Sequence, residues 1–149
     1  MKPGSHLIIS SIAATGLTLG SQSWLAGVSC LAGGVLIDLD HVIDYKIEKK
    51  RIPLDYRQLS DFCQYDKKGK LYLIFHGVEY CVAMFVMLLL YPHPVLLGFL
   101  CGVSLHLMCD HLFNPLRPGA YFMLFRWRKN FERRFIFKQD YVQKILQIS

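Results

Sequence analysis

The apolar residues of this chain fall into two long blocks. The first block, 7–37, contains no Asp, Glu, Lys or Arg, and the polar turn GSQS at 20–23 divides it. The second block, 71–109, contains one charged residue, Glu79, and the turn YPHP at 91–94 divides it because proline cannot continue a helix. Unbroken apolar stretches of this length indicate helices. The pattern predicts four of them, at about 6–19, 23–37, 71–91 and 95–113.

The basic residues lie outside these blocks. All 17 Lys and Arg residues fall at Lys2, in the segment 42–70 or after Pro115. In an up-down-up-down bundle these three places share one end, which the positive-inside rule assigns to the cytoplasm. The sequence therefore predicts a multi-pass inner-membrane protein with both termini inside. Only the third helix reaches the ~20 residues of a full span, so partial insertion and a buried soluble bundle remain alternatives.

The composition is consistent with a single membrane protein domain. The 149 residues are 53% hydrophobic and carry a formal charge of +6, which suits a single membrane-embedded domain, 1–149. The five cysteines form no CxxC pair, and we interpret them as reduced packing residues. We expect the glycines within the apolar blocks to allow close helix packing, at positions 16, 20, 27, 33, 34, 98 and 102.

The segments between and after the apolar blocks are basic. The tail, 115–149, interleaves aromatic residues with Arg and Lys, which predicts an amphipathic helical segment on an anionic phospholipid surface. No helix-turn-helix, zinc-finger or RNA-recognition signature supports a nucleic-acid partner. The loop predicted at 42–70 is long enough to be a lid over a site, and a solvated linker is the alternative. Within it, Asp44 is interpreted as a loop charge.

Histidines and carboxylates gather where the predicted helices reach the cytoplasmic end. Asp38, Asp40 and His41 would close the second helix, whereas His93 alone would lie at the opposite turn. An aspartate at a helix C-terminus is disfavoured by the helix dipole, so a compensating cation is expected. Nine residues are candidate metal ligands: His6, Asp38, Asp40, His41, His76, Glu79, His106, Asp110 and His111.

The spacing of two pairs supports a metal site. On helices, His76 and Glu79 at i,i+3 would share a face, as would His106 and Asp110 at i,i+4. Mixed imidazole and carboxylate ligands suit Zn, Mn or Fe, and Zn is the first choice here. Nine candidates exceed the four ligands of one tetrahedral zinc, which predicts one or two ions with some candidates orienting the ligands or acting as a base.

These motifs resemble a known family. The ordered set His6, the DLDH of 38–41, the FHG of 75–77, His106 and the DH of 110–111 is similar to the YdjM-like membrane-bound metal-dependent hydrolases, predicted enzymes that include LexA-regulated bacterial members. The resemblance extends to about residue 128. It implies an integral membrane protein with metal-dependent hydrolase activity, distantly similar to zinc-dependent phospholipase C. Family members often have proline where this chain has Ile37.

Phosphoester hydrolysis is the reaction that this site would support. Two metal ions would lower the pKa of a bridging water and neutralise the phosphate, with Asp40 or Glu79 as the catalytic base. At the membrane surface the substrate would be a phospholipid or a lipid-linked phosphate. Two alternatives are a bis-histidine haem protein with axial ligands His76 and His106, which the neighbouring carboxylates disfavour, and a metal-binding sensor or scaffold without catalysis.

Overall fold

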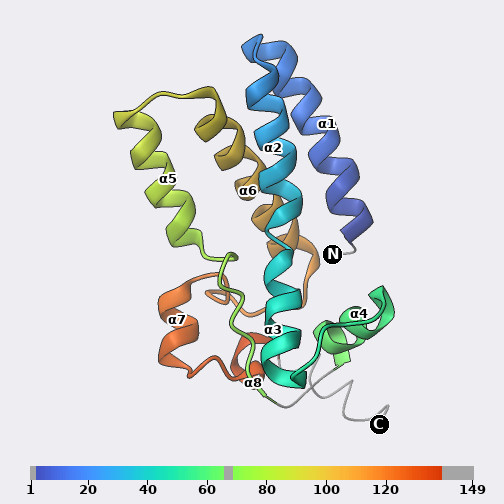
Figure 1. Ribbon diagram of the computed structural model, residues 1–149. Helices are drawn as coiled ribbons and strands as arrows, with labels where there is room; N and C mark the ends of the chain where they lie inside the picture. Colours follow the sequence, from blue (N-terminus) through green and yellow to red (C-terminus); the bar gives the residue numbers. More distant parts are fainter. Residues whose placement is uncertain (1–2, 66–68, 139–149) are drawn as a thin grey trace. The chain divides into compact units, whose positions relative to one another are not determined.

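The computed structural model describes residues 3–65 and 69–138, which form helices joined by short connections and two isolated β-bridges (Figure 1). The all-helical prediction is thus confirmed. The helices are α1 (Pro3–Ser21), α2 (Trp24–Leu36), α3 (Leu39–Lys49), α4 (Tyr56–Tyr65), α5 (Val78–Leu90), α6 (Pro94–Phe113), α7 (Met123–Arg128) and α8 (Arg133–Ile136). The chain divides into two compact units: unit 1 is Met1–Asp38 with Gly77–Asn114, and unit 2 is Leu39–His76 with Pro115–Ser149.

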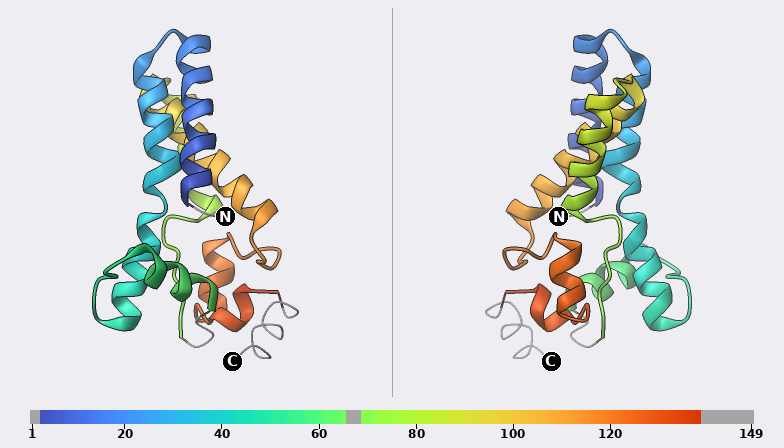
Figure 2. Two further views of the ribbon diagram at one scale, coloured as in Figure 1. Left: turned by 90° about the vertical axis from the view of Figure 1, so that its right-hand side faces the viewer. Right: turned by 90° about the vertical axis from the view of Figure 1, so that its left-hand side faces the viewer.

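Three helices form the packed part of unit 1. Helices α1 and α2 run antiparallel after a tight turn, and α6 packs against both of them (Figures 1 and 2). Helix α5 packs mainly against α6 and contains no buried residue, whereas α2 and α6 contribute most of the buried positions. The regular antiparallel four-helix bundle therefore stays a prediction.

Glycines bring α2 and α6 into close backbone contact. A Cβ atom placed on Gly98 would overlap the carbonyl oxygen of Ala26, and one placed on Gly102 would overlap that of Cys30. The predicted role in helix packing is confirmed at these positions and at Gly27, Gly33 and Gly34, where a Cβ would also overlap neighbouring atoms. It is wrong for Gly16 and Gly20, where no described atom outside the adjoining backbone of their own helix lies within 4 Å of the Cβ position.

Two helical stretches are long and apolar enough to cross a membrane by length and composition. These are Trp24–Lys49, which runs through α2 and α3, and Pro94–Phe113, which is α6. In each, only 44% of the apolar window is buried. A core helix of a soluble protein is mostly buried, whereas more than half of each of these windows is not buried.

Unit 2 contains more structure than its sequence suggested. The predicted loop 42–70 is wrong over most of its length, because it includes most of α3 and all of α4. The predicted third helix begins at Val78 rather than at residue 71, since the segment before it is held in an irregular conformation by side chains described below. The small apolar core of unit 2 consists of Leu71, Leu73, Ala120 and Ile136.

The basic tail follows its prediction only in part. It forms the short helices α7 and α8, and residues 139–149 lie outside the described part of the chain. Two of its arginines are buried rather than interfacial. Arg126 donates to the carbonyl of Ala120, and Arg133 donates to the carbonyl of Phe62 and lies 4.2 Å from the centre of the Phe62 ring. These contacts explain how the charged residues of the described part of the tail pack into unit 2.

The glycine contacts predict a position-specific effect of alanine. Gly102→Ala should lower the thermal unfolding temperature of the detergent-purified protein, because overpacking against a backbone carbonyl costs about 1–3 kcal/mol. Gly16→Ala is the matched control, and it should leave stability unchanged or raise it by up to about 1 kcal/mol through helix propensity. Equal unfolding temperatures for the two variants would contradict the close contact between α2 and α6.

Candidate metal centres

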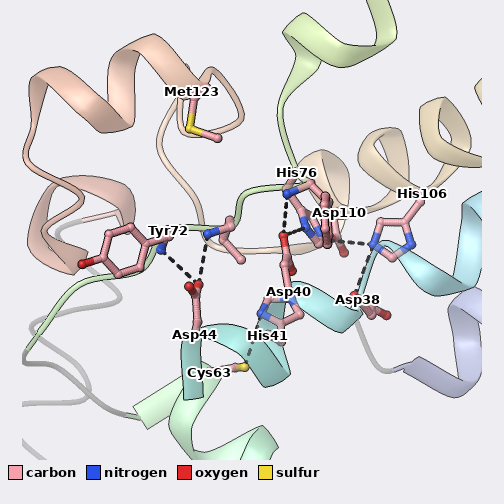
Figure 3. Close-up of polar contacts among 12 residues, drawn as sticks. Asp38, Asp40, His41, Asp44, Cys63, Tyr72, His76, His106, Asp110 and Met123 are labelled. Atoms are coloured by element: carbon pink, nitrogen blue, oxygen red, sulfur yellow. Dashed lines mark hydrogen bonds and ion pairs between the residues drawn. The ribbon is translucent and has the colours of Figure 1, made fainter. Parts of the chain in front are cut away.

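Unit 1 brings two buried histidines and a buried aspartate together at one end of α1 and α6. His6 comes from α1, and its Nε2 lies 3.0 Å from Asp110 Oδ1. The ring of His6 stacks on that of His106, with 3.8 Å between centroids, and His106 Nε2 lies 3.4 Å from Asp110 Oδ2. His106 and Asp110 are one turn apart on α6, so the predicted i,i+4 pair is confirmed (Figure 3). The group offers one ligand atom per residue within 4.8 Å of one another.

A break after α2 fixes the orientation of His106. In an unbroken helix the Asp38 N–H would donate to the Gly34 carbonyl, but here it donates to Val35. The Gly34 carbonyl instead lies 2.8 Å from His106 Nδ1. Because a carbonyl only accepts hydrogen bonds, Nδ1 is the donor. A metal-ligating histidine is typically oriented in this way by the ring nitrogen that does not bind the metal.

The other nitrogen of His106 faces negative charge. Nε2 lies 3.4 Å from Asp38 Oδ1 and 3.4 Å from Asp110 Oδ2. A nitrogen lone pair between two carboxylates is stable only with a cation between them, either a proton on the ring or a metal ion. The donor set of two imidazoles and a carboxylate, with Asp38 beside it, fits a divalent transition metal.

Unit 2 holds a second group, formed by Asp40, His41 and His76, whose ligand atoms also lie within 4.8 Å of one another (Figure 3). Asp40 is fully buried, and its Oδ2 accepts the backbone N–H of Phe75 at 3.0 Å and lies 2.8 Å from His76 Nδ1. Its other oxygen, Oδ1, is also buried, and no residue in the described ranges donates a hydrogen bond to it. A buried carboxylate oxygen without a donor is costly, and a bound cation would offset that cost.

The helix assignments of four predicted ligands are corrected by the structure. Asp38 lies in the turn after α2, while Asp40 and His41 lie in the first turn of α3 rather than at the end of the second helix. The dipole of α3 therefore stabilises the negative charge of Asp40. The unfavourable dipole interaction that was expected for an aspartate at a helix C-terminus does not apply to this residue. His76 precedes α5, so its predicted i,i+3 pairing with Glu79 on one helix is wrong.

Seven of the nine predicted ligands thus lie in or beside one of the two groups. Glu79 and His111 belong to neither group, so their roles as ligands stay predictions. Glu79 is half-buried in the first turn of α5, and its Oε2 turns back to 3.3 Å from the Cβ position of Gly77. His111 is exposed in the last turn of α6.

Sequence reasoning missed three residues that support the unit 2 group. Asp44 is buried in α3 rather than a loop charge, Arg126 donates to the His76 carbonyl at 3.1 Å, and Cys63 Sγ lies 3.5 Å from His41 Nδ1. The i,i+4 spacing of Asp40 and Asp44 places both on one helix face, but only if this segment is helical, which its sequence does not predict. Nothing in the sequence distinguished Arg126 from its exposed basic neighbours.

No family model matches the chain, and neither a curated protein nor a solved structure is similar enough to match it. The two groups therefore rest on their own geometry.

The two groups predict separate losses of metal. We expect elemental mass spectrometry of the purified protein to find one to two equivalents of a divalent transition metal. His6→Ala should remove the ion of unit 1 and Asp40→Ala that of unit 2, because each change deletes a ligand. His93→Ala is the matched control, since that histidine is exposed at the start of α6, where its Nδ1 accepts the N–H of Val95. Metal loss in the control, or full metal content in both ligand variants, would contradict the assignment.

Proposed function

We propose that this chain is a membrane-bound metal-dependent hydrolase that cleaves a phosphoester, in a phospholipid or a lipid-linked phosphate, at the cytoplasmic membrane surface. The observation that carries the proposal is the pair of buried histidine and aspartate groups in a chain whose helices expose apolar residues. The motif resemblance to membrane-bound hydrolases supports the same function.

Exposed apolar side chains of unit 1 support the membrane part of the proposal. The side chains of Ile12 and Leu19 on α1 and of Leu90 on α5 are each at least two-thirds exposed, and many other large apolar side chains are exposed too. A soluble protein rarely exposes so many large apolar side chains together. The hydroxyl groups of α1 also support a membrane environment. Ser11 and Thr15 donate to carbonyls four residues earlier in their own helix, which satisfies both hydroxyls without water.

The surface of α7 supports an anionic lipid as partner. Leu124 and Trp127 are exposed by more than half, and the exposed Arg128 and Lys129 follow directly. Aromatic and aliphatic side chains next to basic ones suit the boundary between acyl chains and phosphate headgroups. The same basic residues would raise the local concentration of an anionic substrate.

The residues of the groups have distinct roles in the proposed reaction. His6, His106 and Asp110 would hold one divalent ion, and Asp40, His41 and His76 would hold another. A bound divalent ion supplies Lewis-acid polarisation of a phosphoryl oxygen and lowers the pKa of a water molecule. Asp40 Oδ2 accepts the N–H of Phe75 and Oδ1 is buried, so Asp40 is better suited to be a metal ligand than a general base that receives a proton from water. Glu79, which is partly exposed, is the better placed of the two predicted bases to accept a proton.

A non-catalytic metal-binding protein, a sensor or scaffold, is the second candidate. It is favoured by the burial of most ligands, since structural metal sites are closed whereas catalytic sites keep an open position. The two candidates differ in turnover, not in metal content.

Glu79→Gln separates catalysis from metal binding. The metal-loaded variant should retain its ions but hydrolyse phosphoesters about 100-fold more slowly, because an amide cannot accept the proton that a general base takes. Turnover would be followed with a chromogenic phosphodiester and with phospholipid vesicles. Glu132→Gln is the control, because that carboxylate contacts Arg134 in α8 and should leave turnover unchanged. Absence of turnover by the metal-loaded wild-type protein on all phosphoesters would favour the sensor or scaffold.

Membrane topology is tested by reporter fusions. A fusion at residue 50 should report the cytoplasm, and one at residue 93 should report the opposite side, since the basic segments lie on the side of residue 50. Alkaline carbonate should leave the untagged protein in the membrane pellet. Release into the supernatant, or the same reporter signal at both positions, would contradict a membrane-spanning unit 1.

A further inference from the structure

Asp44 is a buried carboxylate that belongs to neither ligand group. It lies one turn after Asp40 on α3 and is 2% exposed. Its Oδ2 accepts two consecutive backbone N–H groups, those of Tyr72 and Leu73, each at 3.0 Å (Figure 3). A carboxylate that is removed from water and receives two backbone donors fixes the segment that supplies them.

The segment held by Asp44 has an unusual backbone. Leu73 has a φ of 47°, in the left-handed region that leucine rarely adopts. Two successive N–H groups in such a turn form a concave site for an anion. In this chain the anion is the side chain of Asp44, so the carboxylate stabilises a conformation that Leu73 would otherwise leave.

The turn at Leu73 leads directly to a metal-ligand candidate. The His76 N–H donates to the Leu73 carbonyl at 3.0 Å, and His76 Nδ1 lies 2.8 Å from Asp40 Oδ2. Asp40 and Asp44 therefore hold the segment 72–76 from one face of α3, as expected for residues at i,i+4. A change at Leu73 would alter the approach of the His76 ring to Asp40 and His41.

We propose that Asp44 is a positioning residue for the unit 2 metal centre, setting His76 through the left-handed turn at Leu73. This inference rests on the proposed metal binding by Asp40, His41 and His76, but not on the identity of the substrate. Other contacts hold the two ends of the segment: Leu71 N–H donates to Phe131, and Arg126 donates to the His76 carbonyl. Loss of the Asp44 carboxylate should therefore change the orientation of His76 without undocking the segment.

The test is metal affinity, measured on the full-length protein in a His6→Ala background so that the unit 2 group is isolated. Zn²⁺ affinity would be measured by competition with a chelator, and the ligand geometry by the visible absorption of the Co²⁺ form. Asp44→Ala should weaken Zn²⁺ binding by about 10- to 100-fold, the usual effect of losing a residue that orients a metal ligand, and should change the Co²⁺ spectrum.

Two further variants separate the hydrogen bonds of Asp44 from its charge and from the general effect of losing an aspartate. Asp44→Asn retains an oxygen that accepts both N–H groups, so it should recover most of the affinity and the wild-type spectrum. Asp55→Ala is the matched control, because Asp55 also accepts a backbone N–H in unit 2, that of Gln58, but is exposed. It should bind Zn²⁺ as the background does.

Each outcome decides the proposal. Unchanged Zn²⁺ affinity in Asp44→Ala would overturn the positioning role and leave the proposed hydrolase standing. If Asp44→Ala does not fold, Asp44→Ser takes its place, because its shorter side chain cannot reach both N–H groups, and unchanged Zn²⁺ affinity in that variant would overturn the positioning role. A folded Asp44→Asn variant with at least tenfold weaker binding would show that charge rather than position matters. Absence of metal in the His6→Ala background would overturn the positioning role, and absence in the wild-type protein would overturn the proposed function as well.

Discussion

The cost of burying carboxylates governs the arrangement of both candidate centres. Asp40, Asp44 and Asp110 are almost completely removed from water, and an unpaired charge in that position would cost several kcal/mol. Each carboxylate therefore has a histidine or a backbone N–H within 3.0 Å. Those partners lie far away in the sequence, so satisfying each carboxylate orders a distant segment. The result in unit 2 is an irregular stretch whose shape is dictated by α3.

In unit 1 the close packing of α2 and α6 orients a candidate ligand, His106. The glycines of α2 and α6 let the two backbones approach until a carbonyl oxygen of one helix occupies the space of an absent side chain on the other. At that separation the His106 ring reaches the carbonyl of Gly34, which the break at Asp38 leaves available. The packing thus determines which nitrogen of His106 faces the carboxylates.

The sequence predicted the helices of unit 1 well because charge-free apolar blocks ending at turns leave few other choices. It failed for unit 2, where helices and connections are short and polar and depend on contacts between distant residues. The ligand candidates could be found from residue type and position in the apolar blocks. The helix start at Leu39 and the irregular segment before Val78 could not, because no local signal showed that Asp40 and Asp44 would take the backbone donors of 72–75.

Access of water distinguishes a catalytic metal site from a structural one, and a partly exposed residue lies in or beside each group. In unit 1 the side chain of Asp38 is 23% exposed, whereas those of His106 and Asp110 are at most 3% exposed. In unit 2 His41 is half-buried while Asp40 and His76 are fully buried. If an ion binds in either group, the buried ligands would hold its geometry and the partly exposed residue would mark the side open to water. An open side of this kind is expected for hydrolysis and unnecessary for a closed structural ion.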